Sequence, residues 1–478
     1  MGSPGLRLPA FPAPRVPSVD AGNPWLWACA AVALGGLLGL ATGVGGSSAG
    51  LGVALLPIGL ALLLRPDWLP VALVVTVFAE AFSIGGVSIS RVAGPLALAL
   101  LLLQIRHRSP ADLRTLDRPL AVVIVLYALW ATTSSLWTVD FDTSLSGAGT
   151  PYTVISLLLS AIYLVAIAAL VRSEQHLLRV VWAVWGLSTV MGLLAIAEFL
   201  GGQARSVGIS GDANFFASLQ IVAIPLGAVV ASHARTGAQR LIVLGGVGIA
   251  VGSVFTSLSR GGILALAALT LMLIFQPART FFRTKARKRL FLAALLVGAA
   301  VLLSASYSAL SARTSSLFTT ADGGSGRANL WLAAETGYRQ HPVFGLGFGA
   351  FQSQANDLMR MTPGVDFSAY RLRPGGQPVH NAYLESLVEL GPLGLALFVG
   401  MLGFALRALR RSARLATAGD APLVAAVSRA LTLSLLAFAL TSVLLSTETD
   451  RTLWVMLGLA LILPRIAAAS SAPRRRLA

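Results

Sequence analysis

Long apolar runs, separated by short polar connections, occupy most of this chain. A helix that crosses a membrane needs roughly 20 apolar residues, and the pattern predicts twelve to fourteen such segments. The Gly-rich join at 41–52 leaves open one re-entrant hairpin in place of two spans. The predicted segments are 25–44, 48–64, 69–83, 92–105, 119–137, 151–171, 178–200, 213–232, 240–257, 262–276, 290–307, 381–406, 422–445 and 452–469. The pattern therefore predicts an all-α integral membrane protein.

One polar stretch, residues 308–379, interrupts this series and predicts a large, partly helical loop. The loop divides the chain into five predicted regions. These are a flexible tail (1–24), N-terminal transmembrane helices (25–307), the loop (308–379), C-terminal transmembrane helices (380–469) and a basic tail (470–478). The first apolar segment has no small-residue cleavage site after it, so we expect a retained anchor and not a signal peptide.

Composition supports the same class. The chain is 56% hydrophobic and 12% charged, with a mean hydropathy of +0.78, which excludes a large soluble enzyme. Cys29 is the only cysteine. The chain therefore has no intrachain disulfide and no metal cluster held by thiolates.

Basic residues gather in alternate loops, which predicts the orientation in the membrane. The loops concerned contain Arg106, Arg108, Arg114 and Arg118; Arg172 and Arg179; Arg235 and Arg240; Arg279, Arg283, Lys285, Arg287, Lys288 and Arg289; Arg407, Arg410, Arg411 and Arg414; and Arg474, Arg475 and Arg476. If this set is cytoplasmic, both termini lie inside and the large loop lies outside. The net charge of +17 is then mostly a topology signal with some attraction to anionic lipid. Its dispersal over short loops leaves no continuous basic face for nucleic acid.

Three arginines fall on the predicted outer side. Arg205 and Arg260 follow or join apolar segments, and Arg327 begins a predicted helix in the large loop. Each has a plainer role, as an interfacial anchor (Arg205, Arg260) or a solvated surface residue (Arg327). Because guanidinium groups match phosphate oxygens and stay charged in a partly dry pocket, the set together favours a site for a phosphorylated ligand.

His380 is the candidate catalytic residue, at the outer start of a predicted span. Its imidazole can accept a proton from an attacking hydroxyl or hydrogen-bond a phosphate. Asn381 and Glu385 follow it on one helix face. The alternative is that His380-Asn381 only caps the helix.

Two further motifs are less specific. The glycines at 345, 347 and 349 resemble a phosphate loop, but no strand precedes them and no Lys-Ser/Thr follows. Their plainer use is close approach of the backbone. Asp140-Phe141-Asp142 is an outward Asp-x-Asp that could hold a divalent metal. Because such short matches are frequent by chance, we expect no metal there.

Several motifs, in order, resemble the O-antigen ligase and polymerase family between residues 134 and 394. They are Ser135-Leu136-Trp137-Thr138-Val139-Asp140; Arg205 with Gly211-Asp212-Ala213-Asn214; Ser257-Leu258-Ser259-Arg260-Gly261-Gly262; Gly326-Arg327 with Trp331; Pro342 with Gly345-Leu346-Gly347-Phe348-Gly349 and Phe351; and His380-Asn381-Ala382-Tyr383-Leu384 with Glu389-Leu390-Gly391-Pro392-Leu393-Gly394. Ala213 stands where the family has proline.

The resemblance implies a metal-independent glycosyltransferase without a cofactor. It would move a glycan from a polyprenyl-pyrophosphate carrier to a hydroxyl of a glycan, lipid-core or protein acceptor. The reaction would occur on the outer face of a bacterial cytoplasmic membrane, with the polyprenyl chain between spans. The expected roles are diphosphate binding by Arg205, Arg260 and Arg327, catalysis or diphosphate binding by His380, and support from Asn214, Trp331, Asn381 and Glu385.

The alternative function is a transporter or a flippase for lipid-linked glycans, without covalent chemistry. Such proteins usually have repeated halves and ionisable residues near the bilayer midplane. This chain has no convincing repeat, and Glu80, Glu198 and Glu385 lie toward the outer ends of their spans. The sequence therefore favours the enzyme.

Overall fold

A computed structural model of the chain describes residues 68–78, 83–84, 87–88, 116–146, 152–208, 210–282, 284–319, 326–367 and 372–471. All of them belong to the compact unit that begins at Arg65. The predicted spans at 25–44, 48–64 and 92–105 lie outside the described residues, as does the predicted tail at 1–24.

The described part is built almost entirely of helices. Their bounds are α2 Leu69–Phe78, α4 Arg118–Thr133, η3 Ser134–Leu136, α5 Phe141–Ser146, α6 Val154–Leu170, α7 Glu174–Leu200, α8 Ala213–His233, α9 Gly237–Thr256, α10 Arg260–Phe275, η4 Ala278–Thr280, α11 Lys285–Thr319, α12 Arg327–Gln340, α13 Phe351–Met361, α14 Ala382–Ala418, α15 Pro422–Thr441 and α16 Arg451–Ser471. Strands β1 (Ser83–Ile84) and β2 (Val87–Ser88) form one short antiparallel pair.

Eight of these helices are long and apolar enough to cross a membrane, namely α4 with η3, α7, α8, α9, α11, α14, α15 and α16. The shorter apolar helices α2, α6 and α10 also coincide with predicted spans. The chain is therefore an all-α, multi-pass membrane protein, as its apolar pattern predicts. Apolar side chains such as Val122, Leu129 and Leu193 are more than half exposed, which suits a surface solvated by lipid.

Polar side chains at the starts of the helices explain where many of them begin. Asp117 caps α4, Thr153 caps α6 and Ser173 caps α7, each accepting a hydrogen bond from a backbone N–H of the first turn. Thr236 and Gln239 form a reciprocal capping box at the start of α9. These caps satisfy N–H groups that have no partner within the helix.

Helix α8 lies at the centre of the bundle and is buried over almost its whole length. It packs against α7, α9, α10 and α15, while α14 packs against α4, α15 and α16. Buried hydroxyls in this core find backbone acceptors. Ser434 donates to the Val222 carbonyl (2.7 Å) and Ser160 to the Thr449 carbonyl (2.6 Å).

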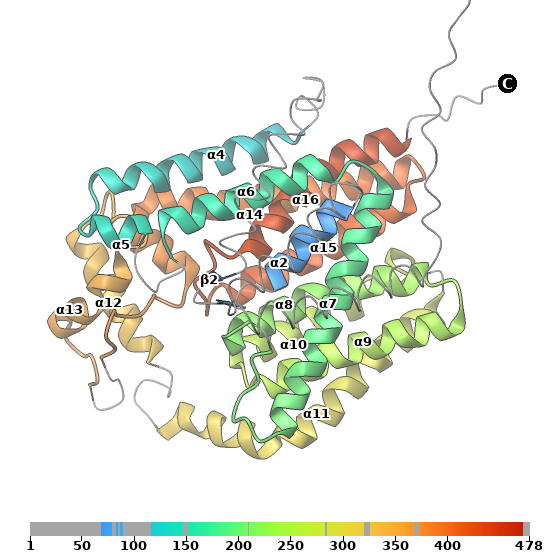
Figure 1. The fold of residues 1–478 in the computed structure, drawn as a ribbon, viewed down its shortest axis with the longest axis horizontal. Coiled ribbons are helices and arrows are strands. Elements are labelled where there is room, and N and C mark those ends of the chain that lie inside the picture. Colours follow the sequence, from blue (N-terminus) through green and yellow to red (C-terminus); the bar gives the residue numbers. More distant parts are fainter. Residues whose placement is uncertain are drawn as a thin grey trace, which may run out of the picture. The chain divides into compact units, whose positions relative to one another are not determined.

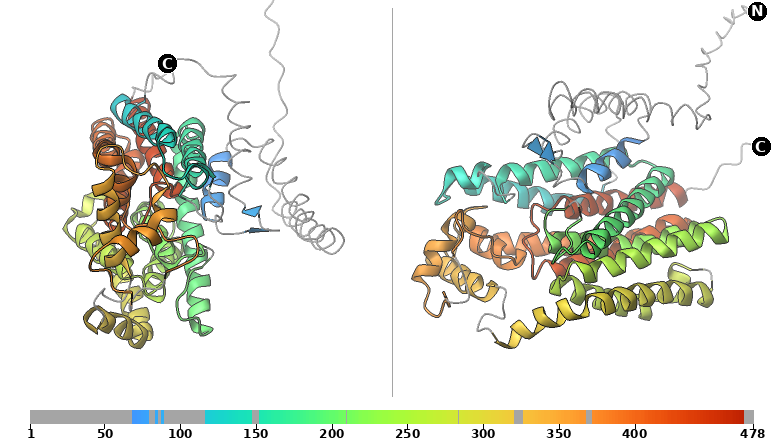
Figure 2. Two further views of the ribbon diagram at one scale, coloured as in Figure 1. Left: turned by 90° about the vertical axis from the view of Figure 1, so that its left-hand side faces the viewer. Right: turned by 60° about the horizontal axis from the view of Figure 1, so that its bottom comes forward.

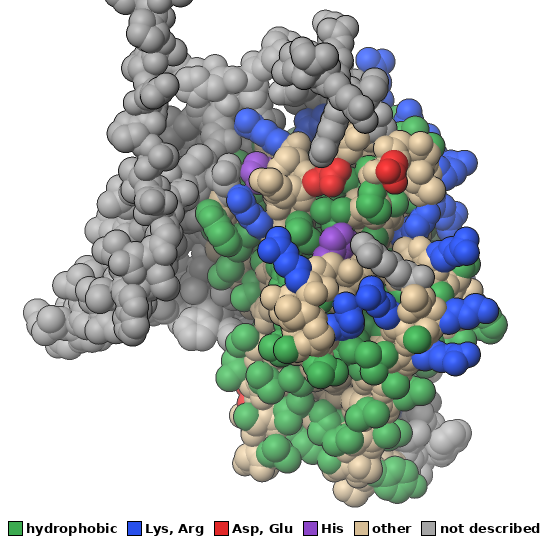
Figure 3. All heavy atoms as spheres, turned by 90° about the vertical axis from the view of Figure 1, so that its right-hand side faces the viewer, with side chains coloured by type: hydrophobic (Ala, Val, Ile, Leu, Met, Phe, Trp, Pro, Cys, Tyr) green, Lys and Arg blue, Asp and Glu red, His purple; other side chains and the backbone are tan. Residues whose placement is uncertain are grey.

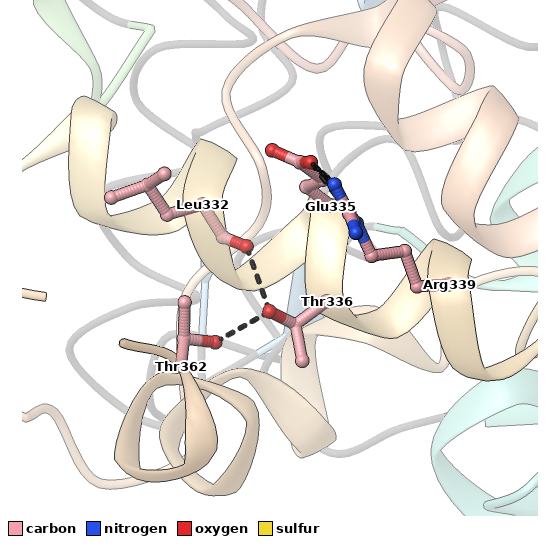
Figure 4. Close-up of polar contacts among 5 residues, drawn as sticks. All are labelled: Leu332, Glu335, Thr336, Arg339 and Thr362. Atoms are coloured by element: carbon pink, nitrogen blue, oxygen red, sulfur yellow. Dashed lines mark hydrogen bonds and ion pairs between the residues drawn. The ribbon is translucent and has the colours of Figure 1, made fainter. Parts of the chain in front are cut away.

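The segment between α11 and α14 forms a structured cap at one end of the bundle (Figure 1). Helix α11 runs along the bundle toward this end, and the views of Figure 2 show α12 and α13 gathered there. A buried apolar core that includes Leu330, Phe351 and Val379 joins the two short helices to the start of α14. Thr362, just after α13, donates to Thr336 on α12 at 2.9 Å (Figure 4).

The opposite end of the bundle is basic. Figure 3 shows lysine and arginine side chains gathered on this face, where α7, α9 and α15 begin and α8 and α14 end. Asp117, whose side chain is fully buried, pairs there with Arg407 at 2.7 Å and Arg411 at 3.5 Å. The cap and the basic face are therefore on opposite ends, as the alternation of charged loops requires.

The positive-inside rule predicts that the basic end faces the cytoplasm and the cap faces outward. In a Cys29→Ser background, single cysteines at the exposed positions Asp357, on the cap, and Ala238, at the basic end, test this orientation. A membrane-impermeant maleimide should label Asp357→Cys in intact cells, or in spheroplasts if an outer membrane is present. It should label Ala238→Cys only after lysis, and the reverse pattern would contradict the orientation.

Candidate active site at one end of the helix bundle

A break in α14 organises the cap. Gly391 has φ +68°, and Pro392 follows it without a backbone N–H, so the carbonyls of the preceding turn are left without helical partners. The N–H groups of Leu346 and Gly347 donate to the carbonyls of Val388 and Glu389, both at 2.9 Å. The break therefore becomes the docking edge for the Gly-rich segment.

Glu389 completes this docking with its side chain. The buried carboxylate accepts hydrogen bonds from the backbone N–H groups of Gly349 (2.7 Å) and Phe351 (3.1 Å), where α13 begins. These amides therefore bind a carboxylate of the protein.

Close approach explains the glycines. A Cβ at Gly345 would lie 2.3 Å from the Glu389 carbonyl carbon, and one at Gly347 would lie 2.4 Å from the Thr138 side chain. Both glycines also have positive φ. The interpretation of the motif as close backbone contact is confirmed.

The cap also fixes the residue before His380. The indole N–H of Trp331, on α12, donates to the Val379 carbonyl at 3.2 Å. Val379 and Val388 are both fully buried in the core of the cap. Trp331 thus anchors the backbone just before His380.

His380 sits at the junction of cap and bundle in a left-handed conformation, with φ +56°. Such a conformation in a non-glycine residue costs on the order of 1–3 kcal/mol and needs support from its surroundings. The His380 N–H donates to the Ser446 hydroxyl at 3.1 Å. The capping of α14 is done by Asn381, whose side chain accepts from the N–H groups of Tyr383 and Leu384, both at 3.1 Å. The helix-capping interpretation therefore holds for Asn381 and not for the side chain of His380.

The imidazole of His380 is neutral at pH 7. Its pKa is lowered to about 4, mainly by burial and also by Arg327 and Arg373, against an opposing effect of Asp212. Its Nδ1 atom is buried and has no hydrogen-bond partner among the described residues. An uncharged imidazole with an open ring nitrogen is suited to accept a proton.

Arg205 and Arg260 are joined through the starts of α8 and α10. The Arg205 Nε donates to the Ser257 carbonyl at 3.1 Å, and its Nη2 donates to Asn214 Oδ1 at 3.4 Å. Asn214 Oδ1 also accepts from Ser259 (2.9 Å), which caps α10. Arg260 is the first residue of α10, so it belongs to the helix and not to the connection in which the sequence pattern placed it.

Asp212 interacts electrostatically with both Arg205 and His380. Burial lowers the pKa of the half-buried Arg205, Asp212 raises it and Arg260 lowers it again. The same Asp212 acts on His380. Asp212 thus acts on both Arg205 and His380, while Arg260 acts on Arg205 and Arg327 acts on His380.

Sequence reasoning missed Asp212 and Arg373 as members of the site. Asp212 is the N-cap of α8, accepting from the N–H groups of Asn214 (2.7 Å) and Phe215 (3.0 Å). Arg373 lies in an exposed Pro-Gly-Gly turn seven residues before His380. The Asp before an apolar run, and a second arginine on the predicted outer loop, were the available signals.

The helix dipoles add to the positive field. Helices α8, α10, α12 and α14 begin at Ala213, Arg260, Arg327 and Ala382, around these same residues. The N-terminus of a helix carries about half a positive charge and favours anions. Arginines at the first positions of α10 and α12 are unfavourable for the helices alone and suit an anionic ligand.

The Asp-x-Asp motif has a structural role. Asp140 caps α5 through a hydrogen bond from the Thr143 N–H at 3.1 Å. Partial burial raises the pKa of Asp140, but hydrogen bonds from Thr143 and Ser353 lower it overall. Within the described ranges, no group of three or more His, Cys, Asp or Glu side chains is arranged to hold a metal ion.

The fold defines a multi-pass membrane protein in which the candidate site, with its arginines, His380 and four helix N-termini, lies at one end of the helix bundle. The family model for O-antigen ligase matches residues 245–399, which agrees with the resemblance that the sequence motifs carry. The matched segment contains Arg260, Arg327 and His380, whereas Arg205 and Asn214 precede it. A search of curated proteins finds no match. The match to this family model supports a function in glycan transfer.

The docking of the Gly-rich segment can be tested with Gly347→Ala. The added Cβ meets Thr138 and the residue has φ +100°, so we expect the melting temperature in detergent to fall. Gly364→Ala is the matched control, because Gly364 has φ +85° but its Cβ would meet nothing within 4 Å. The control should lose about 1 kcal/mol of stability from backbone strain alone, and Gly347→Ala clearly more. Equal losses would show that the contact contributes nothing.

Proposed function

We propose that this protein is a glycosyltransferase that uses a polyprenyl-pyrophosphate-linked glycan as donor. It transfers the glycan to an acceptor hydroxyl on the outer face of the bacterial cytoplasmic membrane. The observation that supports the proposal is electrostatic: Arg327 acts on a neutral, half-buried His380, and Asp212 acts both on His380 and on Arg205, which Arg260 also affects. These residues lie at the end of the bundle opposite the basic loops, where a lipid-linked donor meets water.

The chemistry needs fixed positive charge. An acceptor oxygen forms a bond to the anomeric carbon, and the bond from that carbon to the diphosphate oxygen breaks. The electron pair leaves with the diphosphate, whose charge grows as the sugar departs. Arginines held before the reaction stabilise this charge without reorganisation. In this proposal Arg205 and Arg260 bind one part of the diphosphate and Arg327, with Arg373, the other.

His380 takes the proton of the acceptor hydroxyl. Its half-buried position and neutral state at pH 7 support this role over that of a cationic diphosphate ligand. Asn214 orients Arg205, while Trp331, Asn381 and Glu385 hold the backbone around His380. The acceptor is a glycan, a lipid core or a protein that presents a hydroxyl at the membrane surface.

Purified protein in lipid nanodiscs should transfer glycan from a synthetic polyprenyl-pyrophosphate donor, with and without EDTA. Arg327→Ala should lower kcat/KM by about 10- to 1000-fold, because one charge-assisted contact to the diphosphate is lost. Arg339→Ala is the control on the same helix, since Arg339 pairs with Glu335 on the exposed face (Figure 4). It should retain wild-type activity.

Movement of the intact lipid-linked glycan without transfer would favour the flippase alternative. A wild-type protein without transfer activity toward any acceptor class would contradict the proposal. Equal activities of Arg327→Ala and Arg339→Ala would remove Arg327 from the site.

The low pKa of His380 predicts that kcat/KM falls only at an unusually low pH. As pH falls, the base is lost only when the imidazole takes up a proton, at about pH 4 in the free enzyme. The pH profile of kcat/KM should therefore stay level through pH 6.5, the ordinary value for histidine, and fall near pH 4 to 5. A limb centred near 6.5 that disappears in His380→Gln would contradict the buried, neutral assignment.

A further inference from the structure

The loop between α15 and α16, residues 442–450, packs against the start of α14. The Ala382 N–H donates to the carbonyls of Ser442 and Leu445, both at 2.9 Å. The Tyr383 hydroxyl donates to the Ala439 carbonyl at 2.8 Å. This loop is more than sixty residues from His380 in sequence, yet it fixes the turn that follows His380.

Ser446 makes the contact to His380 itself. Its hydroxyl accepts from the His380 N–H at 3.1 Å and donates to the Glu385 carboxylate. Both Ser446 and Glu385 are almost fully buried, with 1% and 2% of their surface exposed. A serine hydroxyl has one proton and two lone pairs. Because the Ser446 hydroxyl directs its hydrogen toward Glu385, one of its lone pairs is free to accept the hydrogen bond from the His380 N–H.

The contact matters because the His380 backbone is strained. A histidine at φ +56° has a lower-energy conformation at negative φ, and a change of φ would swing the imidazole away from its place. The hydrogen bond to Ser446 fixes the direction of the His380 N–H and so restrains rotation about the N–Cα bond, which sets φ. Trp331 holds the preceding carbonyl and Asn381 the following turn, so Ser446 supplies the remaining restraint.

We propose that Ser446, oriented by Glu385, is a positioning residue that keeps His380 in its left-handed conformation for proton transfer. This inference rests on the proposed function of His380. It concerns the geometry of the base and not the binding of the donor. Neither Ser446 nor Glu385 touches the substrate in this assignment.

The test uses Ser446→Ala in the purified protein in nanodiscs, with a polyprenyl-pyrophosphate-linked glycan as donor. Misplacement of a catalytic group without its removal typically costs 10- to 100-fold. We therefore expect kcat to fall by about that factor, while the KM for the donor stays within about threefold. Ser446→Thr keeps the hydroxyl and should recover much of the activity. Ser446→Val has the same shape as threonine without the hydroxyl and should behave like alanine.

Ser434→Ala is the matched control. Ser434 is equally buried and also hydrogen-bonded, but to the Val222 carbonyl in the middle of the bundle. It should retain kcat, with only a lower melting temperature. A second control is the double variant His380→Ala/Ser446→Ala, which should be no slower than His380→Ala alone if Ser446 acts through the imidazole.

Two outcomes would overturn the inference while leaving the proposed function intact. One is an active wild type with Ser446→Ala as fast as Ser434→Ala. The other is a Ser446→Val variant as active as Ser446→Thr, a comparison that holds even if the alanine variant fails to fold. A wild type that transfers no glycan would instead contradict the proposed function itself.

Discussion

The break in α14 at Gly391-Pro392 is the constraint on which the cap depends. A proline inside a helix leaves backbone carbonyls without partners, and in a membrane protein each buried polar group needs one. Here the missing N–H groups are supplied by Leu346 and Gly347, from a segment more than forty residues earlier. Glu389 adds two further hydrogen bonds to the same segment. At about 0.5–1.5 kcal/mol for a typical hydrogen bond, this set holds the cap in one register against the bundle.

The same docking explains how positive charge comes to lie near His380. With the cap in register, Trp331 fixes Val379, and Arg327 reaches the electrostatic neighbourhood of His380. On the bundle side, Asn214 ties Arg205 to the start of α10. Positive charge from arginines and from four helix N-termini is thus concentrated at the membrane boundary. The one neutral base in this field is His380, because its burial opposes a further charge.

Much of the fold could be predicted from the sequence, because apolar runs of membrane length have few alternatives. Each candidate span in the described part coincides with a predicted one, although α11 continues to Thr319, well past the predicted end at 307. The site was partly predictable. Arg205, Arg260 and His380 stand out as polar residues at the ends of apolar segments that are predicted to face outward, and Arg327 stands out in the predicted outer loop.

The remaining parts of the site depend on contacts that no local pattern carries. Ser446 is one of two serines in a short connection, and only the fold shows that it meets the His380 N–H. Asp212 looks like an ordinary helix cap, and its second effect on His380 follows from packing. The glycines at 345, 347 and 349 resemble a phosphate loop only weakly, and the structure shows that the N–H groups of Gly347 and Gly349 donate to the carbonyl and carboxylate of Glu389.

The central claim, that the arginines at the capped end bind a diphosphate, is tested most directly by ligand affinity without catalysis. Binding of polyprenyl pyrophosphate without a glycan can be measured in nanodiscs for the wild type and for Arg205→Ala/Arg260→Ala. Polyprenyl alcohol of the same length serves as the uncharged ligand. Loss of two charge-assisted contacts predicts about a 100-fold or greater drop in affinity for the pyrophosphate and no change for the alcohol. Equal affinities of the two proteins for the pyrophosphate would contradict the account.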